Sequence, residues 1–252
     1  QQATADKQGL VWSLGELQPG DERTALLLHC AHDGRPADPP ELPKLDGGAL
    51  LDETVDRYTA WSLSLLQVDV PDPLVADLID GLKMSLKVQT AAAGGPCPMS
   101  EYTRTWARDN IGPSLAWLRL GAFEDQERLM DFIYGAIVET GDLQNSYAAD
   151  LDFTEGKAEP DWAAMEPLSQ RVAAETPSYL VWIYGAWNRH TGRTERAAAH
   201  YGLLHRALFA QGFGEDNLLP FTGDETYRAA MNATFGLALE VAHHDISWSL
   251  NS

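Results

Sequence analysis

The sequence predicts a mainly helical protein with a short β segment at its N-terminus. After residue 49, apolar residues recur at three- and four-residue spacings over most of the chain. Pro, Gly and Asp stand at the ends of these periodic segments. The first 33 residues instead carry short apolar runs on either side of a turn. The predicted helices cover residues 50–68, 74–90, 110–120, 124–139, 173–190, 194–211 and 224–242.

Residues 1–33 are predicted to form strands. Residues 10–14 and 24–30 flank Pro19-Gly20, a pair that is typical of a turn. Two strands do not make a stable sheet alone. The segment is therefore either the end of a larger β-sandwich or a small hairpin attached to the helices. Residues 34–48, rich in Pro, Gly and Asp, form a predicted linker, and residues 49–252 form the predicted helical domain.

The first two predicted helices each carry an apolar stripe. Pro71 and Pro73 end the first helix, and Asp72 is predicted to cap the second with Pro73 at its first position. The first stripe comprises Leu51, Val55, Tyr58, Trp61, Leu65 and Leu66, and the second comprises Val75, Leu78, Ile79, Leu82 and Leu86.

The later helices repeat this pattern on both sides of a long polar segment, residues 141–162. Loops of this length are usually functional or disordered, and the aromatic residues Tyr147 and Trp162 favour a binding loop. Trp187 is predicted to be a core residue because its spacing matches its helix's stripe, with a ligand contact as the alternative. The stripes comprise Ile111, Leu115 and Leu118; Leu129, Phe132, Ile133 and Ile137; Leu180, Ile183, Tyr184 and Trp187; and Tyr201, Leu204 and Leu208.

The formal net charge of −19 disfavours binding to nucleic acid or to an anionic membrane surface. No apolar run approaches the roughly 20 residues that a membrane span needs. Cys30 and Cys97 are too few for a zinc site, and they form either one disulfide or two buried thiols. Neighbouring His243 and His244 would point in different directions on a helix, so we expect no metal site there, and no cofactor is expected either.

Residues 98–110 combine arginines, acids, a tyrosine and a tryptophan in a run without clear helical or strand periodicity. This mixture suits a pocket for a polyhydroxylated ligand. Trp106 can stack on the C–H face of a sugar ring, while Arg108 and Asp109 bind its hydroxyls in charge-assisted hydrogen bonds. The alternative is a structural Arg–Asp pair that caps the following helix.

The segment Trp106-Ala107-Arg108-Asp109, following a Gly/Pro-rich turn, resembles the W-x-R-D segment of glucoamylase-type glycoside hydrolases. The resemblance extends loosely over residues 9–252. It implies an (α/α)6 toroid preceded by a β-sandwich, and an inverting hydrolase whose W-x-R-D segment lines the subsite for the non-reducing sugar. The consecutive helices, joined by short and long connections, are compatible with such a toroid. The expected carbohydrate-binding residues are Tyr102, Trp106, Arg108, Asp109 and Trp162.

Asp224 and Glu225 form an acidic pair at the start of the last predicted helix. Acids in a first turn also complement the helix dipole without any catalytic role. In the resembling family the general acid belongs to such a pair, at a similar remove from the Arg-Asp motif. The resemblance therefore implies that Glu225, or its neighbour Asp224, is the proton donor. The family usually shows Trp-Glu-Glu there, whereas this chain has Gly223-Asp224-Glu225, which puts the transfer in doubt.

The implied activity is inverting hydrolysis of α-glucosidic bonds at a non-reducing end. In the family the general base lies farther towards the C-terminus, beyond the position of Ser252. A closed toroid also needs about twelve helices, more than the periodic segments supply. We therefore expect other polypeptide, either pieces of one cleaved precursor or subunits, to complete the toroid. The alternative is a non-catalytic carbohydrate-binding or structural toroid protein.

Overall fold

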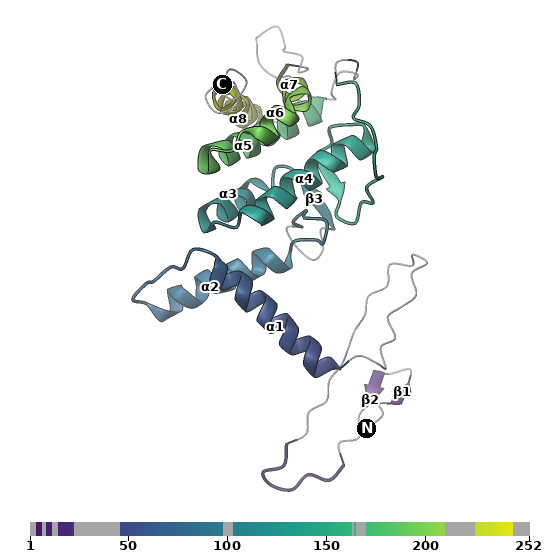
Figure 1. Cartoon of the computed structure of the whole chain (residues 1–252), viewed down its shortest axis with the longest axis vertical. Helices are drawn as coiled ribbons and strands as arrows, with labels where there is room; N and C mark the ends of the chain where they lie inside the picture. Colours follow the sequence, from purple (N-terminus) through teal and green to yellow (C-terminus); the bar gives the residue numbers. More distant parts are fainter. Residues whose placement is uncertain are drawn as a thin grey trace. The chain divides into compact units, whose positions relative to one another are not determined.

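The computed structural model describes residues 4–6, 9–11, 15–22, 46–97, 103–162, 164, 170–209 and 225–243. These residues are mainly helical, which confirms the prediction of a mainly α chain (Figure 1). The helices are α1 (Gly47–Ser64), α2 (Pro73–Val88), α3 (Ile111–Leu120), α4 (Phe123–Thr140), α5 (Gln170–Thr191), α6 (Glu195–Ala199), α7 (Tyr201–Phe209) and α8 (Glu225–Val241). The strands are β1 (Thr4–Asp6), β2 (Gly9–Val11), β3 (Arg104–Trp106) and β4 (Ser146–Ala148). The chain divides into two compact units, Gln1–Trp61 and Ser62–Ser252.

The first unit contains the predicted turn. The Asp21 amide donates to the Gln18 carbonyl oxygen at 2.9 Å, which confirms a turn at this position. β2 pairs antiparallel with β1, the strand that precedes it in the chain. Its predicted partner, residues 24–30, lies outside the described residues, as does Cys30. α1 begins earlier than predicted because the Asp46 carboxylate accepts hydrogen bonds from the Gly48 and Ala49 amides.

In the second unit, α2 begins as the sequence predicts. Asp72 caps it by accepting a hydrogen bond of 2.9 Å from the Leu74 amide, and a proline occupies the first turn. The one fully buried residue of α2 is a lysine, while Ile79 and Leu86 of its predicted stripe are half-buried. Lys83 is buried and pairs with Asp80 at 2.9 Å, and Lys87 pairs with Asp125 of α4.

The core lies among α3, α4 and α5. α3 packs against α4 and α5, and α5 also packs against α7 and α8, so these helices form successive layers (Figure 1). Gly121, with φ of 76°, ends α3 and allows the tight connection to α4. The predicted stripes of α4 and α5 are confirmed as core. Their buried residues are Leu129, Phe132, Ile133 and Ile137 in α4, and Leu180, Ile183, Tyr184 and Trp187 in α5.

Some local predictions are wrong. The helix predicted over 194–211 is broken at His200 into α6 and α7, because His200 leaves the helical conformation and its imidazole binds other helices. Trp106 lies in β3, which leads into α3, and the segment predicted as a loop over 141–162 contains β4. The two strands pair with each other across 42 residues, and no local periodicity marks such a pairing. Tyr201 is 43% exposed instead of buried.

Among the described residues, no helix has both the length and the apolar character that crossing a bilayer requires.

Candidate functional site

The antiparallel pair β3–β4 supports the segment that the sequence singles out. Trp106 lies opposite Ser146, and Arg104 lies opposite Ala148. The Arg104 guanidinium donates to the Ser146 hydroxyl and to the Ser146 carbonyl oxygen, both at 2.7 Å. Thr105, which lies between Arg104 and Trp106 in the sequence, is buried. Because side chains alternate along a strand, Arg104 and Trp106 lie together on the outer face of this pair.

A turn, residues 107–110, joins β3 to α3, and two asparagines fix it. The Ala107 amide donates to the Asn145 carbonyl oxygen at 3.1 Å. The Asn110 side-chain amide donates to the Trp106 carbonyl oxygen at 2.7 Å. Asn110 is also the N-cap residue of α3, although its side chain bonds Trp106 and no helix amide. The indole of Trp106 is therefore carried on backbone that is hydrogen-bonded from both sides.

Arg108 and Asp109 follow on the same turn and lie near the surface. The Arg108 Nε and an Asp109 carboxylate oxygen are 3.5 Å apart, and their side chains are 41% and 38% exposed. The Arg–Asp pair considered in the sequence does form, but Asn110 holds the cap position, so the capping role is wrong. Both charged side chains therefore lie near the surface, two and three residues after the half-buried Trp106.

The polar segment that follows β4 runs along α4 and is fastened to it. The Phe153 ring packs edge-on against Phe132, with ring centroids 5.8 Å apart. The Glu139 carboxylate accepts hydrogen bonds from the Thr154 amide at 2.9 Å and from Lys157 at 3.0 Å. These contacts lower the pKa of Glu139, chiefly through the Thr154 amide and then through Lys157. The segment, residues 149–162, is therefore ordered along α4, and we call it the strap.

The strap ends in a polar aromatic group that we call the His200 cluster: Tyr134, Glu159, Trp162, Tyr184 and His200. The Glu159 carboxylate accepts from the Tyr134 hydroxyl and, at 2.9 Å, from the Trp162 indole N–H. The Tyr134 ring stacks on the His200 imidazole, with centroids 3.5 Å apart and planes 3° from parallel. His200 Nδ1 and the buried Tyr184 hydroxyl are 2.6 Å apart. The cluster thus joins α4, the strap, α5 and the α6–α7 junction.

The electrostatics of the His200 cluster favour a neutral imidazole and an ionised carboxylate. Burial lowers the pKa of His200, and the positive charge of Arg196 lowers it further. Hydrogen bonds from Tyr134 and then Trp162 lower the pKa of Glu159. Burial raises the pKa of Tyr184 far above the physiological range. Each Glu159 oxygen already accepts a hydrogen bond from an aromatic side chain, so this cluster mainly fixes the strap.

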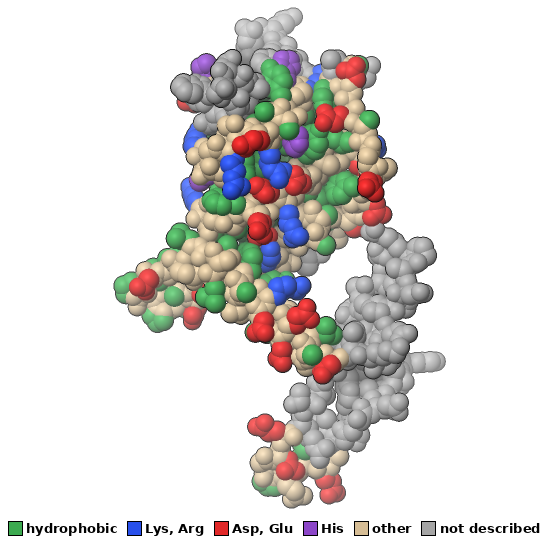
Figure 2. All heavy atoms as spheres, viewed as in Figure 1, with side chains coloured by type: hydrophobic (Ala, Val, Ile, Leu, Met, Phe, Trp, Pro, Cys, Tyr) green, Lys and Arg blue, Asp and Glu red, His purple; other side chains and the backbone are tan. Residues whose placement is uncertain are grey.

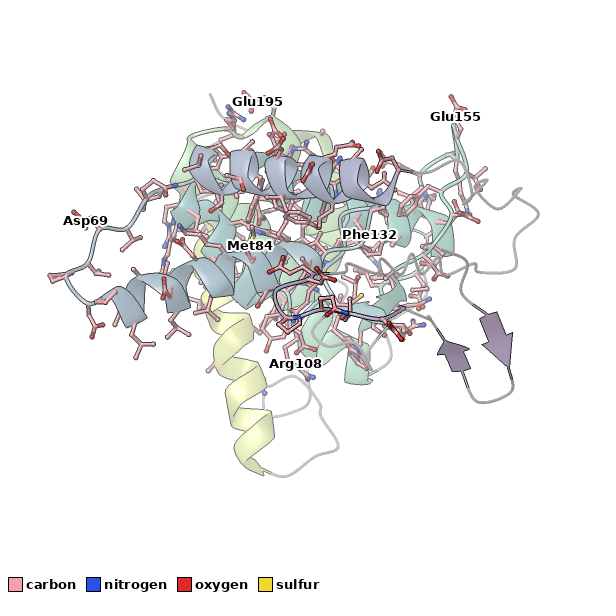
Figure 3. All side chains as sticks on the ribbon, turned by 90° about the horizontal axis from the view of Figure 1, so that it is seen from below. Asp69, Met84, Arg108, Phe132, Glu155 and Glu195 are labelled. Carbon is pink, nitrogen blue, oxygen red and sulfur yellow. The ribbon has the colours of Figure 1, made fainter. Side chains whose placement is uncertain are left out.

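The structure places two of the expected carbohydrate contacts apart. Arg108 lies on one side of the helical body and Glu195 on the other (Figure 3). Trp162 lies against Gly202, shortly after Glu195 in the chain, since a Cβ at that glycine would stand 2.7 Å from the Trp162 ring. Trp162 therefore belongs to the His200 cluster, whereas Trp106, Arg108 and Asp109 form a separate group on the β3–α3 turn.

The acidic pair is described only in part. Glu225 is the first residue of α8, as predicted, but only its backbone is described. Asp224 and Tyr102 lie outside the described residues. Cys97 is a free thiol whose pKa is raised by burial. No group of three or more potential metal ligands occurs within the described ranges.

Sequence reasoning missed the His200 cluster. Its members come from separate segments, and no spacing in the chain links Tyr134, Glu159 and His200. Tyr184 was predicted only as core, and His200 was placed inside a continuous helix. The interrupted helix is the feature that identifies His200, and it becomes visible only in the tertiary structure.

The chain was compared with models of protein families, with curated proteins and with solved structures, and it matches none of them.

Proposed function

We propose that this chain contributes the sugar-binding part of a glycoside hydrolase of the glucoamylase type. In this proposal the enzyme acts on α-glucosidic bonds at a non-reducing end, with inversion. Trp106 packs against the sugar ring, and Arg108 and Asp109 bind its hydroxyls. Glu225, or its neighbour Asp224, protonates the leaving oxygen. A second carboxylate, roughly 6.5–9.5 Å away, activates water on the far side of the ring.

The β3–α3 turn is the observation that supports sugar binding most directly. It presents an indole, a guanidinium and a carboxylate in four consecutive residues, on backbone held by Asn110 and Asn145. Sugar sites combine an apolar surface for one ring face with charged groups for the hydroxyls. A rigid turn reduces the conformational entropy that these groups lose when a ligand binds.

The proposal also requires polypeptide outside this chain. The helices α1–α8 are taken as the first part of an (α/α)6 toroid, with residues 1–33 as the end of a preceding sandwich and 34–48 as the linker. The general base and the remaining helices would come from pieces of one precursor or from subunits. Native mass spectrometry of the purified material should show this chain held to other polypeptides. A monomer that hydrolyses α-glucosides unaided would contradict this part of the proposal.

The Asp109→Asn variant tests the sugar site. The carboxylate is exposed and pairs with Arg108 at 3.5 Å, so the substitution should change stability by less than about 1 kcal/mol. Affinity for maltose, measured by isothermal titration calorimetry, should fall about tenfold or more. Asp77→Asn on α2 is the matched control for an exposed carboxylate and should leave maltose affinity unchanged. Normal maltose binding by Asp109→Asn would exclude this role.

Glu225→Gln tests the proton donor in the assembled enzyme. Hydrolysis of maltose should be abolished, whereas hydrolysis of a glycosyl fluoride should fall less, because fluoride leaves with little protonation. Equal losses on both substrates would rule out an acid role for Glu225.

A non-catalytic carbohydrate-binding protein is the second candidate, and the exposure of Arg108 and Asp109 favours it. Catalytic groups of an inverting hydrolase usually sit where water access is controlled. Binding of maltose that Asp109→Asn abolishes, with no hydrolysis by the assembled protein, would identify this second function.

A further inference from the structure

An apolar surface covers the outer side of α2 and the segment that leads into it. We call it the α2 surface, and it lies wholly within the second unit. Its large apolar side chains are between 40% and 74% exposed. They are Leu63, Leu66, Val68, Leu74, Val75, Leu78 and Leu82. Figure 2 shows hydrophobic side chains gathered over this part of the molecule, with carboxylates beside them.

The spacing of these residues gives the α2 surface the form of a docking face. Leu74, Leu78 and Leu82 follow one another at four-residue intervals, so they form a continuous ridge along α2. Elsewhere in the second unit, the described large apolar residues that are exposed stand singly or as a pair: Val88, Phe153, Tyr201, Leu237 and Leu239. Such scattered residues are normal on a protein surface, whereas a contiguous patch marks an interaction site.

The charge of the α2 surface identifies the kind of partner. Residues 63–82 contain four aspartates and no Lys, Arg or His. The lysines that follow, Lys83 and Lys87, are both engaged in ion pairs with carboxylates. Asp69 and Asp77 are exposed beside the apolar ridge. The surface is therefore apolar at its centre and acidic at its rim.

We propose that the α2 surface binds an amphipathic helix of a partner polypeptide, with leucine-like residues on one face and Lys or Arg on its flanks. The apolar face covers the ridge, and the cations meet the aspartates. A second copy of this chain would bring one acidic rim against another, at a net charge of −19 per chain. This inference stands on the exposed ridge and its charge, and does not depend on sugar binding.

Synthetic helical peptides provide the test. A peptide with leucines on one face and lysines on the other should bind the full chain, as measured by fluorescence anisotropy at physiological salt. A Leu/Glu peptide of the same pattern and an Ala/Lys peptide of the same charge should bind at least about tenfold more weakly. Equal binding of the Leu/Glu peptide would show that apolar contact alone drives binding, and it would overturn the proposal. Equal binding of the Ala/Lys peptide would reduce it to net charge and do the same.

Two pairs of substitutions locate the binding. Leu78→Gln with Leu82→Gln should weaken binding of the Leu/Lys peptide about 100-fold, since two leucines lose their buried contact. Leu237→Gln with Leu239→Gln, on exposed positions of α8, is the matched control and should not change it. Asp77→Asn should cause a smaller loss and reduce the salt dependence. Circular dichroism checks that each variant is folded.

Two further results would overturn the proposal. One is undiminished binding of the Leu/Lys peptide by folded Leu78→Gln/Leu82→Gln protein. The other is a dimer in sedimentation velocity that the same two substitutions dissociate, because the surface would then be a self-association interface.

Discussion

Helices α2 and α4 are both amphipathic and of similar length, but their apolar residues have opposite environments. In α4 the stripe is buried against neighbouring helices, together with polar residues such as Gln126. In α2 the buried residue is Lys83, while Leu74, Leu78 and Leu82 face outwards. Periodicity therefore predicts that a helix has an apolar face, but not that the same chain covers it.

The comparison also separates two ways of holding a helix in place. α4 is held by apolar packing, by the strap and by the ion pair of Asp131 with Arg196. α2 forms one ion pair with another helix, between Lys87 and Asp125 of α4, whereas its Asp72 cap and its Lys83–Asp80 pair are local to α2. Apolar burial contributes about 25 cal/mol per Å², whereas the attraction within a largely buried ion pair is offset by the cost of removing both charges from water. We therefore expect α2 to be the less stable element when the chain is studied alone.

The largest difference in unfolding free energy should appear when one large apolar residue of each helix is truncated to alanine. Phe132→Ala in α4 should lower the free energy of unfolding by about 3–5 kcal/mol, because it removes a buried ring and leaves a cavity. Leu78→Ala in α2 should change it by less than about 0.5 kcal/mol, since that side chain is already mostly in water. Urea denaturation of both variants measures the two values, and similar losses would show that α2 is buried in solution.

Replacing glycine by alanine should change stability in opposite directions at Gly95 and at Gly81. A Cβ at Gly95 would stand 2.8 Å from the Phe132 ring and against the Thr105 hydroxyl, so Gly95→Ala should destabilise the protein by about 1–3 kcal/mol. Gly81 lies within α2 with open space around it, so Gly81→Ala should stabilise the helix by about 0.5–1 kcal/mol. Thermal unfolding checks both signs, and a destabilising Gly81→Ala would point to a covered α2.

The strap should respond to loss of a single hydroxyl. Tyr134→Phe removes the hydrogen bond to Glu159 and should cost about 1 kcal/mol. Amide hydrogen exchange should then rise between residues 149 and 162 while α2 is unaffected. Tyr201→Phe is the control, because Tyr201 is exposed and its hydroxyl does not bond the strap. Unchanged exchange in Tyr134→Phe would mean that Phe153 and Glu139 hold the strap without the cluster.

The smallest effect should be the contribution of His200 to pH dependence. Its pKa in the folded state lies below the ordinary value of 6.5. As the pH falls below 6.5 the unfolded chain therefore binds the proton first, and stability decreases with falling pH. Above that range the contribution is constant. Between about pH 8 and 5, His200→Gln should flatten the curve of unfolding free energy against pH. An unchanged slope would show that other titrating groups cause the pH dependence of stability in this range.

Local features of the fold followed from the sequence. The Asp72 cap with Pro73, the Gly121 terminus of α3 and the core stripes of α4 and α5 are each encoded within a few neighbouring residues. Such signals are readable because they depend on backbone geometry and helical period alone. Among the candidate site residues, the position of Glu225 at a helix start was predicted in the same way.

Tertiary structure decided the rest. The pairing of β3 with β4, the break at His200 and the separation of Trp162 from Trp106 each depend on contacts between segments far apart in the chain. The outward orientation of the apolar face of α2 is of the same kind. By itself, the sequence determined approximately which segments are helical and which of their residues share a face. Only the packing of one segment on another determined which faces are covered, because burial is a property of pairs of surfaces and not of one helix.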